Sequence, residues 1–331
     1  MAERVLLTGA TGFIGRGVAR ALSAAGVELR ALVRGPDPAA RAAAARLRAA
    51  VIGGDLRDAA ARDAAVAGTD VVVHLAALVD PRLTGDEDEV ARVNCRATVE
   101  LAENARAAGA RRFVFMSSIS AMGFWSGRAT AQSACRPVSA YGRAKLEAEQ
   151  RLNRLAGPGF EVIALRPPTV YGPGERYNFL SWVRAVDRGL FRLIGPGENA
   201  FPLCTSENLA RAVTAAVERR VAPGTYLVAD AEPYPIARIH RAIAAALGRR
   251  AARLKLPPRL ALVAAACNEL AARALPRVPL YLTRARVATL TADQPFDVTP
   301  LIESGVRLES RLEEAVAETV AEYRASGLLP G

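Results

Sequence analysis

Two side chains four residues apart, Tyr141 and Lys145, form the pair in this sequence best suited to acid–base chemistry. On a helix, a spacing of four places both side chains on one face, so an ammonium group can lie beside a phenol. A nearby cation stabilises the phenolate and lowers the pKa of the phenol from its usual value near 10. We therefore expect Tyr141 to transfer a proton with the help of Lys145. The lysine is informative, because only two of the 44 basic residues are lysines.

A glycine-rich segment near the N-terminus predicts a dinucleotide-binding turn. An apolar run at 5–7 precedes Thr8 to Gly15, and a helical pattern follows. In this order of strand, turn and helix, Gly9 permits a tight turn, Gly12 lets a pyrophosphate approach the backbone, and Gly15 lets the helix pack on the strand. The N-terminus of the helix offers N–H groups and a positive dipole to the phosphates.

These motifs and several others resemble those of the extended short-chain dehydrogenase/reductase family, often described as NAD-dependent epimerases/dehydratases. The matching segments span nearly the whole chain: Thr8 to Gly15, Gly54 to Leu56, His74 to Ala77, Asn94, Phe113 to Ser118, Tyr141 with Lys145, and Arg166 to Gly174. The resemblance implies hydride transfer at a secondary alcohol or ketone by a trio of Ser118, Tyr141 and Lys145. Ser118 is preferred to Ser117 and Ser120, because family members place this hydroxyl five residues before a glycine, here Gly123.

The resemblance also implies which residues contact the cofactor. They are Gly9, Thr11, Gly12, Phe13, Ile14, Arg34, Asp55, Leu56, Leu75, Ala76, Ala77, Asn94, Lys145, Pro167, Thr169 and Val170. We expect Asn94 to brace a backbone turn rather than to touch substrate. At the end of the second strand, where NAD sites usually carry an acid, this chain has Arg34, which favours NADP. If Arg34 instead stacks on adenine, NAD also binds.

Short apolar runs alternate with Ala- and Arg-rich helical stretches over the first 170 or so residues, at 27–33, 51–52, 70–75, 112–116 and 161–165. This rhythm predicts an α/β fold, a Rossmann-type doubly wound parallel sheet with its ligand beyond the carboxyl ends of the strands. We expect residues 1–171 to form the NAD(P)-binding domain, to which the family resemblance adds a return strand near 225–229. Pro and Gly clusters then break the rhythm, so 172–331 are expected to form mainly a smaller substrate-binding lobe.

Composition narrows the partners. The formal charge of +11 would permit nucleic-acid binding, but the arginines are interleaved with acids, so we expect a small-molecule substrate and no nucleic acid. The N-terminus lacks the features of a signal peptide, and the apolar segment 260–275 is too short to span a membrane. That segment is expected to form an amphipathic helix that packs on the sheet or lines an apolar pocket.

Cysteine and histidine spacing points to a metal-free protein of the cytoplasm. The four cysteines, Cys95, Cys135, Cys204 and Cys267, are far apart, which favours buried free thiols in a reducing compartment. His74 and His240 lack the spacing of metal ligands, so no metal site is expected. The family resemblance further implies a homodimer formed through the helix that holds Tyr141.

Three hypotheses remain for the function. The segments 141–152, 166–174 and 178–181 resemble nucleotide-sugar 4-epimerases and 4-keto reductases, so a nucleotide-activated sugar is the favoured substrate. However, the diphosphate-binding arginine of those relatives is missing from 198–204, unless Arg176 or Arg192 substitutes. The segments 194–199, 207–208 and 260–275 instead resemble 3β-hydroxysteroid dehydrogenase-like enzymes, which act on lipophilic alcohols or ketones. A non-catalytic NADP(H)-binding sensor or assembly protein is the third hypothesis, which the intact trio disfavours.

Overall fold

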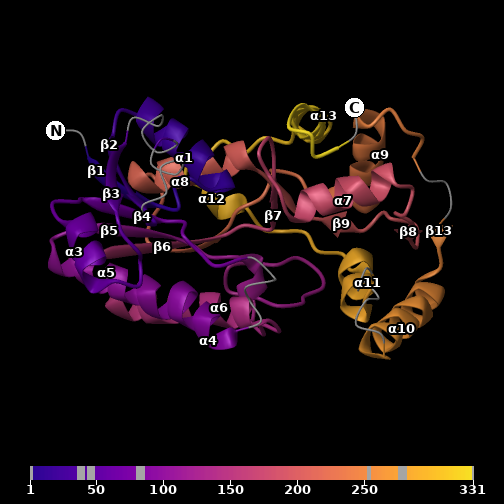
Figure 1. Cartoon of the computed structure of the whole chain (residues 1–331), viewed down its shortest axis with the longest axis horizontal. Coiled ribbons are helices and arrows are strands. Elements are labelled where there is room, and N and C mark those ends of the chain that lie inside the picture. The colour runs from indigo at the N-terminus through magenta and orange to yellow at the C-terminus, as the bar shows by residue number, and fades with distance from the viewer. Residues whose placement is uncertain are drawn as a thin grey trace.

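A seven-stranded parallel sheet forms the centre of the protein, and it confirms the predicted Rossmann-type fold. The computed structural model describes residues 3–35, 42, 49–79, 86–251, 255–274 and 282–329. The strand order is β11-β6-β5-β4-β1-β2-β3, so the chain winds outward in both directions from β1 (Figure 1). The strands are β1 (Arg4–Thr8), β2 (Glu28–Val33), β3 (Ala50–Gly53), β4 (Val71–His74), β5 (Arg112–Met116), β6 (Glu161–Arg166) and β11 (Gly224–Leu227).

Helices cover both faces of this sheet (Figure 1). The helices α1 (Phe13–Ala24) and α8 (Ser206–Val217) lie on one face, and α3 (Ala59–Val66), α5 (Ala97–Ala107) and α6 (Ala140–Leu155) lie on the other. Successive side chains of a strand point to opposite faces, so Val5 and Leu7 pack with α1 and α8 while Leu6 packs with α5 and α6. All three are fully buried, because a parallel sheet is covered on both sides.

The smaller C-terminal lobe has a separate aromatic core built around Tyr171, Phe179, Tyr234 and Tyr323. Its helices are α7 (Asn178–Asp187), α9 (Ile236–Ala246) and α13 (Leu312–Ala325). Three short strand pairs fix its loops: β7 (Thr169–Tyr171) with β10 (Leu203–Thr205), β9 (Ala200–Phe201) with β12 (Tyr234–Pro235), and β8 (Leu193–Ile194) with β13 (Lys255–Leu256). The short helices α4 (Glu87–Ala91) and α12 (Thr299–Glu303) are further elements of the described part of the chain.

Two helices, α10 (Pro258–Ala274) and α11 (Arg284–Thr291), form a pair at the far end of the lobe (Figure 1). The expected packing of this late apolar helix on the sheet is wrong. Small residues, Ala261 and Ala265, face α11 and β8, whereas Leu260 and Leu270 are 58% and 68% exposed. Cys267 on the same helix is also exposed, so the expectation of buried thiols fails there. Among the described residues, no helix is both long and apolar enough to cross a bilayer.

Candidate active site

The hydroxyl groups of Ser118 and Tyr141 meet at the carboxyl end of β5. Ser118 caps a 3₁₀ turn, η2 (Ile119–Ala121), by accepting a hydrogen bond from the Ser120 N–H at 3.1 Å. Tyr141 lies in the first turn of α6, which Ser139 caps by accepting from the Gly142 N–H at 3.0 Å. The Ser118 hydroxyl lies close enough to the phenol of Tyr141 to lower the pKa of that phenol. Both side chains are half-buried, so the pair remains open to a ligand on one side.

Gly142 allows this meeting. A β-carbon at Gly142 would stand within 3.0 Å of the carbonyl group of Ser120, closer than real β-carbons approach a backbone atom. The first turn of α6 therefore packs directly against η2. Because Tyr141 precedes Gly142 in that turn, the close approach of the two backbones sets the distance between the two hydroxyl groups.

The pKa of Tyr141 differs from the sequence-based expectation. Burial raises the pKa of Tyr141 to about 12, and the hydrogen bond with Ser118 offsets only part of this increase. The expected lowering by Lys145 is absent, because the ammonium nitrogen lies 5.7 Å from the centroid of the Tyr141 ring and donates elsewhere. Burial therefore outweighs the cation as the determinant of this phenol's pKa.

Lys145 lies one turn after Tyr141 and is only 1% exposed. Its Nζ donates to the carbonyl oxygen of Met116 at 2.7 Å and lies 4.6 Å from the centroid of the Phe115 ring. Burial lowers the pKa of Lys145 to about 7, although the charge of Glu149 opposes this shift. A lysine with this pKa exchanges its proton near neutral pH.

A buried ion pair continues the same face of α6, and sequence reasoning missed it. Glu149 follows Lys145 by four residues and accepts from the guanidinium of Arg166, whose Nε lies 2.9 Å from the carboxylate. The side chains of Glu149 and Arg166 are 3% and 5% exposed. Ser117 also donates to Glu149, which separates its role from that of Ser118. The spacing of four from Tyr141 through Lys145 to Glu149 was the available signal, because it puts all three side chains on one helix face.

The glycine loop fits a pyrophosphate. Gly9 has a φ of +73° and passes so close to the backbone of Ala76 that a β-carbon would clash. Gly15 packs against the backbone of Gly9 in the same way, whereas Gly12 is exposed. Gly12 caps α1 without any side-chain hydrogen bond to the first turn. The first N–H groups of α1 are therefore available to an anion at this end of the helix.

The other predicted residues of this loop lie beside it. The carbonyl of Thr11 accepts a hydrogen bond from Arg16 at 2.9 Å. Ile14 packs against the core between the sheet and the helices α1 and α8. Phe13 opens α1 and reaches the hollow between α1 and α8.

His74 organises the loop after β4. Thr8 lies beside His74 in the register of β1 and β4, and its hydroxyl lies 2.7 Å from Nδ1 while it also accepts from the Ala76 N–H. The Thr98 hydroxyl lies 2.9 Å from Nε2 and donates to the carbonyl of Asn94. These bonds favour one tautomer, in which Nε2 carries the hydrogen and Nδ1 accepts. Burial lowers the pKa of His74 to about 3, so the ring is neutral.

Asn94 braces the same loop, as the sequence suggests. It lies in a π-helical turn, η1 (Arg92–Arg96), and its amide both donates to and accepts from the backbone of Leu78, at 2.9 and 2.7 Å. The segment 75–78 is thereby held at both ends, and Leu75, Ala76 and Ala77 are half-buried beside the glycine loop. A π-helical turn is rare and is often found at functional sites.

Charged groups gather at the ends of β2 and β3. Arg57 binds Asp55 through two hydrogen bonds of 2.9 and 2.7 Å, and these hydrogen bonds lower the pKa of Asp55 to about 2. Arg34 is exposed after β2 and adds to the positive potential at Asp55. The next residue, Leu56, is buried. The Asp55 carboxylate thus already holds a guanidinium at the position where the family resemblance expects an adenine contact.

The loop after β6 closes the site on its remaining side. The carbonyl of Pro167 accepts from the Ile119 N–H at 3.1 Å, which ties this loop to the turn that begins at Ser118. Thr169 and Val170 follow in β7, half-buried between the sheet and the lobe. The predicted residues from the ends of β1, β4, β5 and β6 therefore converge at one edge of the sheet, as expected for this fold.

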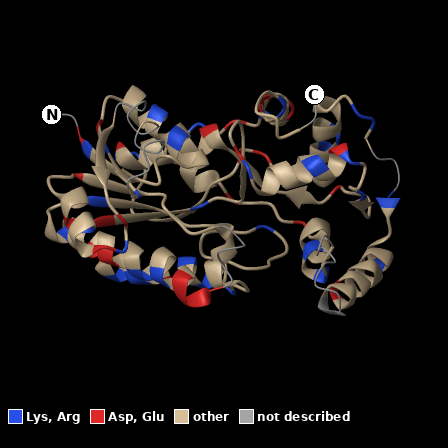
Figure 2. Cartoon of the chain, viewed as in Figure 1, with Lys and Arg blue, Asp and Glu red and all other residues tan. Residues whose placement is uncertain are grey.

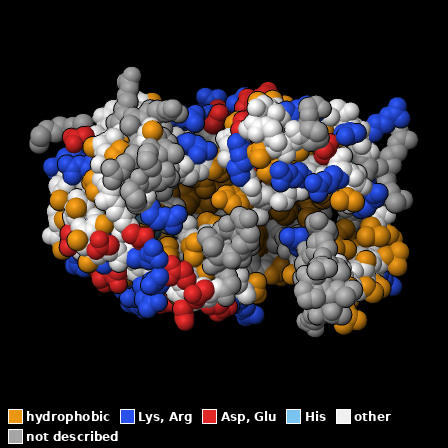
Figure 3. Space-filling view, in the orientation of Figure 1, with side chains coloured by type: hydrophobic (Ala, Val, Ile, Leu, Met, Phe, Trp, Pro, Cys, Tyr) orange, Lys and Arg blue, Asp and Glu red, His pale blue; other side chains and the backbone are white. Residues whose placement is uncertain are grey.

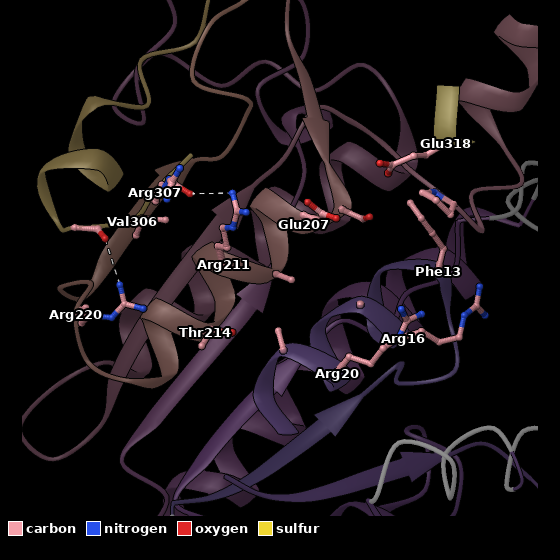
Figure 4. Close-up of a pocket in the computed structure, with 16 residues that line it drawn as sticks. Phe13, Arg16, Arg20, Glu207, Arg211, Thr214, Arg220, Val306, Arg307 and Glu318 are labelled. Carbon is pink, nitrogen blue, oxygen red and sulfur yellow. Dashed lines mark hydrogen bonds between the residues drawn. The ribbon is translucent and has the colours of Figure 1, made fainter. Parts of the chain in front are cut away.

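A hollow of about 540 Å³ lies between α1, α8 and the segment 305–307 (Figure 4). Arginines from three elements line it. Arg211 of α8 and Arg220, just after α8, donate to the carbonyls of Arg307 and Gly305, at 3.5 and 3.3 Å, and so fasten this segment to α8 and the turn that follows it. Arg211 also forms an ion pair with Glu309 at 3.1 Å. These contacts give Arg211 and Arg220 a structural role.

Two further expectations concern charge. Arg176 is ion-paired with Glu322 at 2.6 Å, and Arg192 donates to the carbonyl of Phe191 at 3.0 Å, so both potential diphosphate ligands have partners. Basic and acidic side chains alternate over the helices beneath the sheet (Figure 2). In the described part of the chain, no three His, Cys, Asp or Glu side chains are grouped so that they could hold a metal ion.

The sequence is similar to those of several known proteins. The sequence profile of the NAD dependent epimerase/dehydratase family matches residues 5–229. Ceramide reductase from Caulobacter vibrioides is 30% identical over 331 residues, which cover 98% of this chain and 96% of that protein. UDP-glucose 4-epimerase from Vibrio cholerae is 30% identical over 271 residues, which cover 78% of this chain and 80% of that protein.

A solved structure extends the similarity to the whole fold. MoeE5 in complex with UDP-glucose and NAD superimposes with a TM-score of 0.73 and is 26% identical, and the match covers 98% of this chain and 99% of that one. The similar proteins therefore include enzymes named for a lipid and enzymes named for a nucleotide sugar.

Proposed function

Because the chain belongs to the NAD-dependent epimerase/dehydratase family of extended short-chain dehydrogenases/reductases, we propose that it is an NAD(P)-dependent oxidoreductase acting on a lipophilic secondary alcohol or ketone. The contact between Ser118 and Tyr141, with Lys145 on the same helix face, carries this proposal. It lies at the edge of the sheet where the glycine loop can hold a dinucleotide.

The residues divide the reaction between them. When bound, the nicotinamide dinucleotide accepts or supplies the hydride. In the direction of reduction, the Ser118 hydroxyl holds the carbonyl oxygen of the substrate and the Tyr141 phenol donates a proton to that oxygen. Lys145, whose ammonium donates to the Met116 carbonyl, would hold the cofactor ribose. Gly12 and the uncapped N-terminus of α1 would hold the pyrophosphate, while Gly9 and Gly15 allow the tight packing of the loop.

The surroundings of the site favour a lipophilic substrate. Val79, Phe124 and Val138 are 54%, 53% and 81% exposed. Each lies within six residues of His74, Ser118 or Tyr141, and a bridge between Gly123 and Arg136 brings the segments of Phe124 and Val138 together. Exposed apolar side chains so close in sequence to the site residues suit an apolar ligand. The full-length similarity to ceramide reductase agrees with this choice.

A nucleotide-activated sugar, which the sequence ranked first, is the second candidate. The similarity to UDP-glucose 4-epimerase and to MoeE5 supports it. The partners of Arg176 and Arg192 oppose it, because a diphosphate would have to displace Glu322 or compete with a backbone carbonyl. Arg34 supports NADP as the cofactor, and NAD remains the alternative. A homodimer of a cytoplasmic enzyme, implied by the family resemblance, remains part of the proposal.

Stopped-flow absorbance of the nicotinamide band tests the proposal with NADPH and NADH against 3-ketosteroids, long-chain β-keto acids and UDP-sugars. We expect turnover of a lipophilic ketone by wild type, and none by Tyr141→Phe although the cofactor still binds. Tyr226→Phe is the matched control, because Tyr226 donates only to the carbonyl of Ala222. Turnover of UDP-sugars alone would replace the lipophilic substrate by the second candidate. Silence toward every substrate with tight NADPH binding would instead favour a cofactor-sensing protein.

A further inference from the structure

An apolar stripe runs along the exposed side of α10. Leu260, Val263, Cys267 and Leu270 are spaced by three, four and three residues, which places them on one helix face. Leu260, Val263 and Leu270 are 58%, 61% and 68% exposed, and Leu262 beside them is 43% exposed. The space-filling view shows the resulting apolar patch over α10 at the lower right (Figure 3).

The orientation of α10 is the reverse of that of an ordinary surface helix. Two of its alanines, Ala261 and Ala265, are fully buried against Ile194 and Val287, while its large apolar side chains face outward. A soluble helix usually turns its large apolar residues toward the core, because their contact with water is unfavourable. A cluster of this kind, gathered on one helix, marks a surface that another apolar phase covers.

The sequence of α10 and its flanks is rich in cations. The segment 249–286 carries nine Lys and Arg residues and one acid, Glu269, whereas the whole chain has 44 basic and 33 acidic residues. Glu269 is ion-paired with Arg284 at 2.9 Å and is 19% exposed. Lys255 and Arg259, just before the stripe, are exposed. The apolar stripe is thus bordered by cations and has its one acid neutralised.

We propose that α10 docks this protein on the surface of an anionic lipid bilayer. The apolar stripe enters the boundary between headgroups and acyl chains, and the bordering cations bind the lipid phosphates. The helix lies in the plane of the membrane rather than across it, because its 17 residues include Asn268 and Glu269 and it does not meet the requirements for a span.

A second copy of the chain fits this surface less well. A twofold interface brings the same patch of both copies together, so the cations that border one stripe would face the cations that border the other. Like charges held together across an interface oppose association. An anionic membrane instead offers charge of the opposite sign together with an apolar interior.

The docking surface is linked to the catalytic region. Asn199 donates to the carbonyls of Leu290 and Ala292 at the end of α11, at 3.2 and 2.8 Å. The chain then runs to Gln294, whose side chain donates to the carbonyl of Trp125 at 2.9 Å, seven residues after Ser118. Trp125 also contacts Phe296, with ring centroids 5.4 Å apart. The helix α11, which packs on α10, is therefore connected through these contacts to the segment that bears the exposed Phe124.

The docking proposal depends only on α10 and the cations that border it. The idea that docking lets the enzyme take up a lipophilic ketone from the bilayer rests on the proposed function. The two are separable, because Tyr141→Phe removes turnover and leaves α10 intact. We expect Tyr141→Phe to bind vesicles as wild type does. Vesicle binding without turnover of any lipophilic ketone would contradict the proposed function and leave the docking surface standing.

Cosedimentation with sucrose-loaded vesicles tests the docking, with 30% phosphatidylglycerol in phosphatidylcholine compared with pure phosphatidylcholine. We expect wild type to bind the anionic vesicles, and the triple variant Leu260→Ser, Val263→Ser and Leu270→Ser to lose at least tenfold in partition constant. The matched control is Leu190→Ser with Ile302→Ser, since these side chains are 64% and 46% exposed on other elements. Unchanged circular dichroism and cofactor binding would show that the variants are folded.

A charge variant separates the two components of docking. We expect Lys255→Glu with Arg259→Glu to weaken binding to anionic vesicles by about fivefold for each charge removed. Arg20→Glu with Arg154→Glu changes the net charge equally at exposed positions on α1 and α6, and should have a smaller effect. Failure of wild type to bind anionic vesicles would overturn the proposal. A dimer in light scattering that the serine variant dissociates, without vesicle binding, would assign α10 to a second copy.

Discussion

The carbonyl group of Ser120 lies against Gly142 so closely that no side chain fits between them. This contact joins η2 to the first turn of α6, and these two elements carry Ser118 and Tyr141. The separation of the two hydroxyl groups is therefore set by backbone packing, since both side chains extend from the ends of elements held in direct contact.

Gly142→Ala should lower kcat by roughly 10- to 100-fold, because α6 must retreat from Ser120 and carry Tyr141 with it. Cofactor binding should be retained. Gly157→Ala is the control, because a β-carbon at Gly157 meets nothing within 4 Å. Steady-state kinetics of both variants measure the effect. Wild-type kcat in the folded Gly142→Ala protein would mean that this packing does not position the hydroxyl groups.

The two adjacent serines should respond differently to substitution. Ser118→Ala removes the partner of Tyr141 and should lower kcat about 100-fold or more while leaving thermal stability almost unchanged. Ser117→Ala removes a hydrogen bond to the buried Glu149 and should lower the melting temperature with a smaller effect on kcat. Kinetics and thermal melts of both proteins compare the two. The reverse pattern would exchange the roles of the serines.

Glu149→Leu should destabilise the protein by about 3–5 kcal/mol, because it leaves the buried guanidinium of Arg166 without its carboxylate. The double variant Glu149→Leu with Arg166→Met removes both charges and should recover most of this loss. Denaturant unfolding measures the free energy of unfolding of each protein. Equal stabilities of the single and double variants would show that the pair is not coupled.

His74 should make stability depend on pH. Its pKa is about 3 in the fold because of burial, below its value of 6.5 in the unfolded chain, so the unfolded chain binds the proton more readily between these values. The stability that this neutral ring contributes is fully present above pH 6.5 and is lost as the pH falls toward 3.

His74→Gln should reduce the acid dependence of the free energy of unfolding by up to about 1.4 kcal/mol per pH unit in this range, the slope for one proton. The glutamine retains one donor and one acceptor for Thr98 and Thr8. Urea unfolding between pH 3.5 and 7.5 measures the slope for both proteins. Identical slopes would mean that His74 takes up no proton on unfolding.

Arg34→Asp should raise the Kd for NADPH at least tenfold and leave the Kd for NADH the same or lower, if Arg34 binds the 2′-phosphate. Arg154→Asp is the control, since it makes the same change in charge at an exposed position on α6. Fluorescence titration with each dinucleotide gives the constants. Equal losses in both variants would reduce the effect to general electrostatic attraction.

Local patterns predicted the sheet and the candidate residues because their signals lie close together in sequence. The glycine loop, the strand ends and the Tyr141–Lys145 spacing each occupy fewer than ten residues. Burial and long-range contact were not predictable in this way. The pKa of Tyr141 depends on how deeply α6 is covered, and the pair of Glu149 with Arg166 joins residues from two elements.

The position of α10 shows the same limit. Its apolar sequence led to an expectation of burial against the sheet, yet alanines supply its only buried contacts among the side chains described on that helix. Periodicity identifies the faces of a helix but does not say which one meets the core.

The hydrogen bonds of the C-terminal lobe join residues that are synthesised at different times. Tyr171 donates a hydrogen bond to Asp230. Glu175 accepts a hydrogen bond from Tyr323, which is synthesised 148 residues later. Ser118 and Tyr141 are therefore synthesised well before Tyr323, and the loop after β7 gains this partner only near the end of synthesis. A nascent chain that ends before α13 would contain Ser118, Tyr141 and Lys145 but would lack the hydrogen bond from Tyr323 to Glu175.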